Sequence, residues 1–171
     1  MRVLFVTYHY LHGHGGGIFG SRGFINAFSA LSDELTLLYP VKGGATAEGL
    51  SPAVRTIPVS SEKSSFRKFL DLLAGRIHRY FGVFDRVLAA GDYDTVVFDS
   101  CYASFRLVGK ARKAGCRTIV IHHNYQLEYV RDNYRFPLLL PMLYWTRKAE
   151  CDTVRMCDLN LTVTQDDLAL L

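Results

Sequence analysis

Short runs rich in β-branched residues alternate along the chain with longer segments of helical periodicity, and no other feature restricts the fold as much. Parallel strands need crossover connections, so this pattern predicts a sheet with helices on both faces. We expect an α/β fold, a Rossmann-like three-layer α/β/α sandwich with a mostly parallel sheet of about six or seven strands. The predicted strands are Arg2–Thr7, Glu34–Tyr39, Val54–Val59, Asp94–Asp99, Arg117–His122 and Leu159–Thr164.

Several of the segments between these strands have the spacing of amphipathic helices. Helices are predicted over Ser21–Ser32, over Ala103–Ala114 with Gly115 placed to cap it, and within Phe136–Cys151. The longest stretch, Phe66–Phe84, combines an apolar stripe with several basic residues. We favour a crossover helix packed in the core with a solvated basic face; an amphipathic helix lying on an anionic membrane is the alternative.

The length fits a single domain over residues 1–171, since one hydrophobic core organises about 100–200 residues. A hydrophobic fraction of 49% with 11 Phe and 10 Tyr excludes a disordered chain. The net charge of +4 favours anionic partners but falls short of a nucleic-acid-binding surface. A helix start at Thr164 and Asp167 lies close to Leu171, from which we expect a truncated protein.

The cysteines point to a reducing compartment. Cys101, Cys116, Cys151 and Cys157 form no C-x-x-C pair and are too sparse for a disulfide framework. The N-terminal apolar run is too short for a signal peptide, and no run approaches the roughly 20 apolar residues of a membrane span. We expect a cytoplasmic location, and the sequence leaves open a peripheral position on the inner face of the membrane.

The segment after the first predicted strand is rich in histidine and glycine. It contains His9, His12 and His14, followed by Gly15, Gly16, Gly17 and Gly20. Ligands of open α/β sheets bind beyond the carboxyl ends of the strands, where glycines let backbone amides reach a phosphate at a helix N-terminus. We therefore expect Gly15, Gly16 and Gly17 to contact a phosphate and His14 to contact the substrate.

An NAD-dependent oxidoreductase is an alternative, because Gly15, Gly17 and Gly20 satisfy G-x-G-x-x-G. The motif does not follow the strand directly, and the second strand ends in Leu38-Tyr39-Pro40 without the expected acidic residue. A zinc hydrolase is disfavoured because a glycine-rich segment holds ligands poorly, so we expect no metal. Ser100 lacks a G-x-S-x-G elbow, and Cys101 is expected to be a buried small hydrophobe.

Polar residues also follow the fifth predicted strand. They are His122, His123, Asn124 and Glu128. This position at the carboxyl edge predicts a role in substrate binding for all four. The alternative is a helix start in which Asn124 caps the helix and Glu128 faces solvent. Which of the two histidines faces the site is open from the sequence, although His123 fits better because Asn124 follows it.

In their order and spacing, three features of this chain resemble the N-terminal domain of a GT-B glycosyltransferase of the retaining family 4 type. They are Arg2–Thr7 with the glycines that follow it, His123-Asn124 with Glu128, and the stretch Cys157–Asp167. The last is similar to the family pattern A-D-x-x-x-x-V-S-x-x-D, with Cys157 in place of Ala and Thr164 in place of Ser.

The resemblance implies a hexosyltransferase, of the kind used in polysaccharide biosynthesis, that moves a sugar from a nucleotide-sugar donor to a glycan, lipid or small-molecule acceptor. It implies that Gly15–Gly17 approach the donor diphosphate or an acceptor phosphate, that His123 is catalytic beside the transferred sugar, and that no metal is needed. This half would mainly recognise the acceptor. The family's C-terminal nucleotide-sugar-binding domain is absent from this sequence, so we expect the chain alone to be inactive. A non-catalytic sugar- or nucleotide-binding module with the same sheet is the alternative from another functional class.

Overall fold

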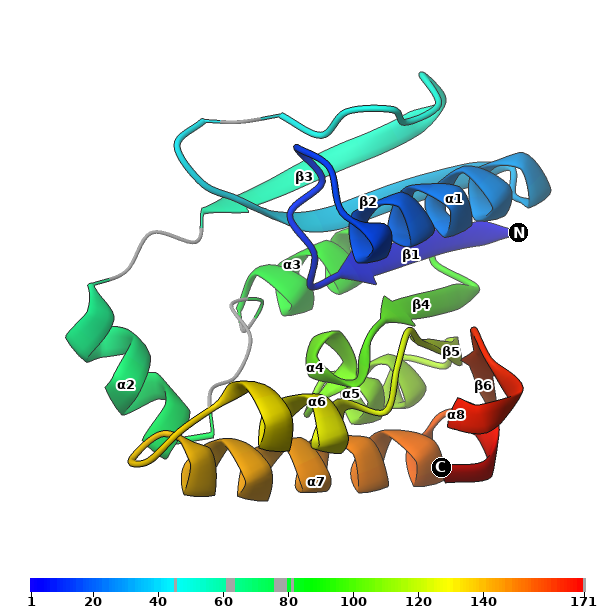
Figure 1. Ribbon diagram of the computed structural model, residues 1–171. Helices are drawn as coiled ribbons and strands as arrows, with labels where there is room; N and C mark the ends of the chain where they lie inside the picture. Colours follow the sequence, from blue (N-terminus) through cyan, green and yellow to red (C-terminus); the bar gives the residue numbers. More distant parts are fainter. Residues whose placement is uncertain (45, 61–63, 76–79, 81, 171) are drawn as a thin grey trace.

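A six-stranded sheet, parallel throughout, forms the centre of the computed structural model, which describes residues 1–44, 46–60, 64–75, 80 and 82–170 (Figure 1). Its order is β3-β2-β1-β4-β5-β6. The strands are β1 (Arg2–Thr7), β2 (Glu34–Val41), β3 (Val54–Ser60), β4 (Thr95–Asp99), β5 (Arg117–His122) and β6 (Leu159–Thr162). The predicted Rossmann-like α/β fold is thus confirmed.

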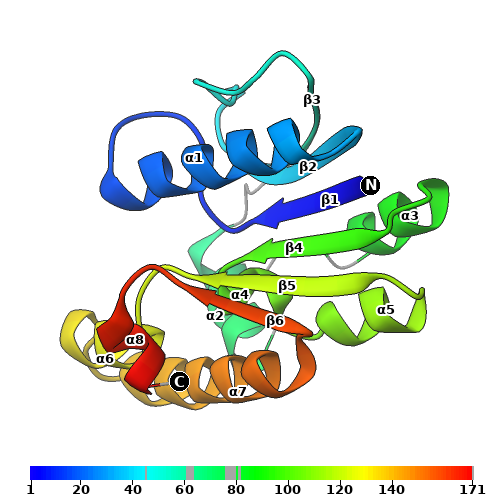
Figure 2. The same cartoon turned by 90° about the vertical axis from the view of Figure 1, so that its right-hand side faces the viewer.

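The two faces of the sheet are both covered, as the apolar strands require. Successive side chains of β1 point to opposite faces: Val3 and Phe5 pack with Ile25 of α1 (Gly16–Leu31), whereas Leu4 and Val6 pack with Phe84 of α3 (Val83–Ala90). These residues are fully buried. Figure 2 shows the helices on the two sides of the sheet, the arrangement of a three-layer sandwich.

Helix α1 begins five residues earlier than predicted, so Gly16, Gly17 and Gly20 belong to the helix and not to a loop before it. The predicted Phe66–Phe84 helix is also different in the structure. Helix α2 covers only Ser65–Leu73, Gly75 takes a φ of +66°, and α3 starts at Val83. Residues 76–79 and 81 of the predicted helix lie outside the described residues.

The remaining helices are shorter or longer than the periodicity indicated. A break at Arg106, with φ of 62°, divides the predicted Ala103–Ala114 helix. A helix after β5 was weighed only as an alternative, and it is present. These helices are α4 (Cys101–Ser104), α5 (Val108–Lys113), α6 (Gln126–Asn133), α7 (Leu139–Met156) and α8 (Gln165–Leu170).

All four cysteines are free, and Cys101 is buried as expected. Among the described residues, no helix is both long enough and apolar enough to span a membrane.

Candidate active site at the carboxyl edge of the sheet

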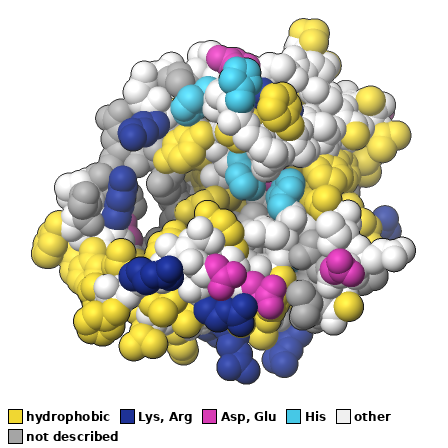
Figure 3. Space-filling view, in the orientation of Figure 1, with side chains coloured by type: hydrophobic (Ala, Val, Ile, Leu, Met, Phe, Trp, Pro, Cys, Tyr) yellow, Lys and Arg dark blue, Asp and Glu magenta, His cyan; other side chains and the backbone are white. Residues whose placement is uncertain are grey.

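A cavity of about 1060 Å³ lies at the carboxyl ends of β1, β4 and β5. In the strand order, β2 and β3 lie on one side of β1, and β4, β5 and β6 lie on the other. The order in which strands are added to the sheet therefore reverses between β1 and β4. Open α/β sheets bind ligands at such a switch point. Tyrosines and other apolar side chains form much of the wall, including Tyr8, Tyr102 and Tyr134. Figure 3 shows histidine side chains near the middle of this face of the molecule.

Asp99, the last residue of β4, is fully buried at the base of this region. The hydroxyl of Thr7 at the end of β1 donates a hydrogen bond of 2.6 Å to its Oδ2, and Nε2 of His123 is hydrogen-bonded to its Oδ1. Parallel register aligns Thr7 with Asp99, so the contact follows directly from strand pairing. Thr7 Oγ1 also accepts a 3.1 Å hydrogen bond from the backbone N–H of His9.

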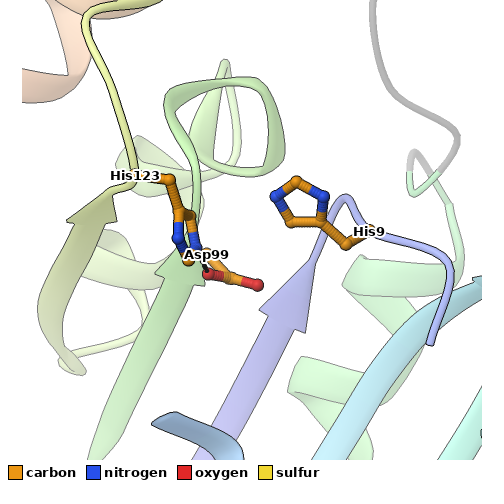
Figure 4. Close-up of side chains that lie close together, drawn as sticks. All are labelled: His9, Asp99 and His123. Atoms are coloured by element: carbon orange, nitrogen blue, oxygen red, sulfur yellow. Dashed lines mark hydrogen bonds and ion pairs between the residues drawn. The ribbon is translucent and has the colours of Figure 1, made fainter. Parts of the chain in front are cut away.

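His9, Asp99 and His123 therefore converge from the ends of three strands (Figure 4). The two imidazole rings meet edge to face with centroids 5.2 Å apart. Helix α1 covers them: a Cβ at Gly17 would lie 3.3 Å from Cε1 of His9, and one at Gly20 would lie 3.4 Å from Cε1 of His123. These two glycines thus make room for the histidines as well as bordering the cavity.

The two histidines have opposite electrostatic environments. Burial lowers the pKa of His9 below its usual value, and the charge of Asp99 only partly offsets this. Burial would also lower the pKa of His123, but its hydrogen bond to Asp99 and the carboxylate charge outweigh burial and raise it. The site therefore holds one neutral imidazole able to accept a proton and one imidazole that retains its proton more strongly.

Asp99 shows the reciprocal effect. Burial alone would raise the pKa of this carboxyl, yet the hydrogen bond and charge of His123 outweigh burial and keep it below its usual value. The carboxylate is therefore ionised over the range in which His123 titrates. A negative group that is fixed and shielded from water in this way orients the imidazole and stabilises its charged form.

Ligand atoms of His9, Asp99 and His123 all lie within 4.8 Å of one another, so this group could hold a metal ion. A cation bound by Nε2 of His123 and Oδ1 of Asp99 would have to replace the hydrogen bond that joins these two atoms. The amides at the start of α1 carry partial positive charge and would oppose a cation nearby. The arrangement therefore suits proton transfer and anion binding better than metal coordination.

Of the residues predicted from the sequence, Gly15, Gly16, Gly17, His123 and Asn124 line the cavity. Gly15 is the N-cap residue of α1, so Gly16 and Gly17 carry the first amides of a 16-residue helix. Of the two adjacent histidines, His123 lines the cavity and His122 does not. Asn124 accepts a hydrogen bond from the side chain of Gln126.

The other predicted binding residues are not brought to this cavity. His14 is exposed and stacks on Phe19. His122 is buried, and its Nε2 lies 3.2 Å from Oδ1 of Asn160 on β6. Glu128 faces solvent in α6, where it pairs with Arg131 at 3.7 Å. Side chains alternate along a strand, so the last strand residue and its successor point to different sides.

Sequence reasoning did not identify His9 and Asp99 as partners of His123. The sequence does indicate that these side chains could meet, since Asp99 ends one predicted strand and His9 and His123 closely follow two others. The order of the strands in the sheet was needed to predict the contact, because only adjacent strands bring their ends together.

No family model and no curated protein matches the sequence. Among solved structures, the chain resembles Phytolacca americana UGT2 complexed with UDP-2fluoro-glucose and pterostilbene, with a TM-score of 0.60 and 9% identity over 98% of this chain. The match covers 49% of that chain, so the present chain spans about half the length of its neighbour. A UGT transferase from Siraitia grosvenorii in complex with UDP matches 77% of this chain and 30% of its own, with a TM-score of 0.44 and 11% identity.

These comparisons concern architecture. At 9% identity the likeness to the Phytolacca protein establishes a shared fold. The shared architecture is the Rossmann-like α/β fold, a six-stranded parallel sheet with covering helices.

Proposed function

We propose that this chain is the acceptor-side half of a glycosyltransferase that uses a nucleotide-sugar donor. The observation that carries the proposal is the convergence of the first amides of α1 with His9 and His123 at one large cavity, where His123 is hydrogen-bonded to the buried Asp99 behind it. The fold shared with UDP-glycosyltransferases supports it. Departure of a nucleoside diphosphate builds negative charge on phosphate, which backbone amides and a protonated imidazole are suited to stabilise.

In this proposal Gly15, Gly16 and Gly17 contribute amides to a phosphate of the donor or acceptor. His123 is the catalytic residue and donates a hydrogen bond at the reacting centre, with Asp99 as its positioning residue. Asn124 belongs to the substrate-binding wall. No metal is required, because the amides and the imidazolium supply the positive charge.

In this proposal the nucleotide is bound by a second Rossmann-like domain, which would close the cleft. Closure excludes water and limits hydrolysis of the donor. The 171-residue chain alone is therefore expected to give no sugar transfer. Mass spectrometry of reactions containing a panel of nucleotide sugars and acceptors tests this, with the product of the complete coding sequence assayed in parallel. Sugar transfer by the 171-residue chain would contradict the need for a second domain. Inactivity of the complete protein would contradict the proposed glycosyltransferase function.

The finer part of the proposal is a retaining, family 4 type hexosyltransferase in which the leaving phosphate accepts the proton of the acceptor hydroxyl. The anomeric configuration of the product, read by NMR, tests this directly. An inverted product would overturn retention and would indicate that His9, the neutral imidazole, accepts the proton instead.

In the complete protein, His123→Ala is expected to reduce kcat about 100-fold or more, the usual contribution of a positioned acid or base. His12→Ala is the matched control, because His12 lies on the same segment as His9 but does not line the cavity. Equal losses in the two variants would contradict a catalytic role for His123.

A further inference from the structure

Helix α2 presents its apolar side to solvent. Its large apolar residues Phe66, Phe69, Leu70 and Leu73 recur at helical spacing and are 71%, 37%, 47% and 50% exposed. On another side of the helix, Lys68, Asp71 and Leu72 line the cavity. A surface helix normally turns its apolar stripe toward the core, so this orientation leaves the stripe available for contact with something outside the domain.

A second exposed apolar segment lies against α2. Helix α6, its connection to α7 and the first turns of α7 expose further large apolar side chains: Tyr129, Phe136, Leu138, Leu140 and Tyr144. Phe136 is the most exposed of these at 82%. Helices α2 and α7 are in contact, and the position of a Cβ on Gly75 would overlap the ring of Trp145. We call the exposed residues of the two segments the apolar patch.

The apolar patch is accompanied by positive charge. Residues 64–75 and 125–148 contain six basic side chains and three acidic ones. The basic residues are Arg67, Lys68, Arg131, Arg135, Arg147 and Lys148, and the acidic ones are Asp71, Glu128 and Asp132. Arg131 is paired with Glu128 and Asp132, and Lys148 with Asp152, so Arg67, Lys68, Arg135 and Arg147 contribute most of the positive charge. Figure 3 shows hydrophobic side chains gathered at the end of the molecule where α2 and the start of α7 lie, with Lys and Arg close to them.

We propose that the apolar patch docks the protein on an anionic lipid surface. Phenylalanine, tyrosine and leucine are the residues that insert at the boundary of headgroups and acyl chains, while adjacent lysines and arginines attract anionic lipids. Because α2 also borders the cavity, docking would hold the cavity mouth close to the lipid headgroups. The inference does not depend on the proposed catalytic function.

Co-sedimentation of the 171-residue chain with vesicles tests the proposal. Vesicles of phosphatidylcholine containing phosphatidylglycerol are expected to bind the chain, and vesicles of phosphatidylcholine alone are expected to bind it much more weakly. Binding should fall as salt is raised, since the Debye length shrinks from about 10 Å at 0.1 M to about 3 Å at 1 M. Absence of binding to the anionic vesicles would overturn the proposal.

Paired variants locate the contact. Phe66→Ser with Phe136→Ser is expected to lower the partition coefficient about tenfold or more, through the loss of inserted apolar area. Leu31→Ser is the matched control, because Leu31 is 76% exposed at the far end of α1, and it should leave binding unchanged. Arg67→Gln with Arg135→Gln should lower binding about tenfold, with Lys113→Gln as the control.

Sedimentation velocity tests whether a second copy of the chain, instead of lipid, covers the apolar patch. If the Phe66 and Phe136 substitutions dissociate a dimer while vesicle binding is absent or unchanged, the patch is a contact between copies of the chain and the lipid proposal fails. Circular dichroism of each variant establishes that the fold is retained, so that a loss of binding can be assigned to the patch.

Discussion

Asp99 organises the candidate site at the scale of single residues. It is fully buried, yet both carboxylate oxygens have hydrogen-bond partners, Thr7 on one side and His123 on the other. Ser100, which follows it, has a φ of 107°, an uncommon conformation for a residue other than glycine. Strain of this kind persists where the surrounding structure determines it, and it tends to occur at functional sites. The residue that the sequence left unassigned is therefore the one on which the histidine geometry depends.

Replacing Asp99 with asparagine is expected to lower the pKa of His123, because the variant keeps a hydrogen-bonding group but loses the charge that stabilises the imidazolium. NMR titration of the histidine Cε1 protons measures the change. Asp85→Asn is the control, since Asp85 pairs with Lys110 at the surface, away from the histidines. A His123 pKa that is the same in Asp99→Asn as in the wild type would show that the ion pair does not set its titration.

At the scale of secondary structure elements, the strands were far better predicted than the helices. Every predicted strand is present within two residues of its bounds, because runs of β-branched residues between turn signals identify buried strands. The start of helix α1 was predicted five residues too late, since three of its first five residues are glycines, which disfavour a helix intrinsically. Packing over His9 and His123 overrides that preference, and such long-range packing cannot be read from local sequence.

Two alanine substitutions in α1 separate helix propensity from packing. Gly23→Ala meets nothing within 4 Å and is expected to stabilise the protein by about 0.5–1 kcal/mol. Gly20→Ala gains the same propensity but places a Cβ 3.4 Å from Cε1 of His123, so its stabilisation should be smaller or lost. Urea denaturation of both variants measures the difference. Equal stabilisation would mean that His123 accommodates the methyl group freely.

At the scale of the whole molecule, the order of the strands determined which predicted residues form a site. His123 and the three glycines line one cavity, whereas His14, His122 and Glu128, which the sequence also offered as binding residues, do not. Alternation along β5 turns His122 toward Asn160, and Glu128 lies on the solvent-facing side of α6; both placements depend on the assembled structure. Helix α6 is joined to α7 by the buried Glu150, which accepts a 2.6 Å hydrogen bond from the backbone N–H of Gln126.

Glu150 makes the stability of the molecule depend on pH. Burial raises the pKa of its carboxyl to about 7, with the backbone N–H groups of Gln126 and Leu127 acting in the opposite direction. The folded state thus holds a proton more tightly than the unfolded chain, whose glutamate titrates near 4.5. This contribution is fully present below pH 4.5 and is lost as the pH rises through about 7. Glu150→Gln is expected to reduce the fall in the free energy of unfolding between pH 5 and about pH 8, measured by urea denaturation. An unchanged slope would exclude Glu150 as its source.

The pairing of β1 with β4 has a consequence for biosynthesis. These neighbours in the sheet are separated along the chain by β2, β3 and the helices α1 to α3. While the polypeptide emerges from the ribosome, β1 can associate with β2 early, but its other edge has no mate until β4 has been translated. Because Asp99 and His123 follow His9 in the sequence, the cluster of these three side chains can form only after about three quarters of the chain has left the exit tunnel.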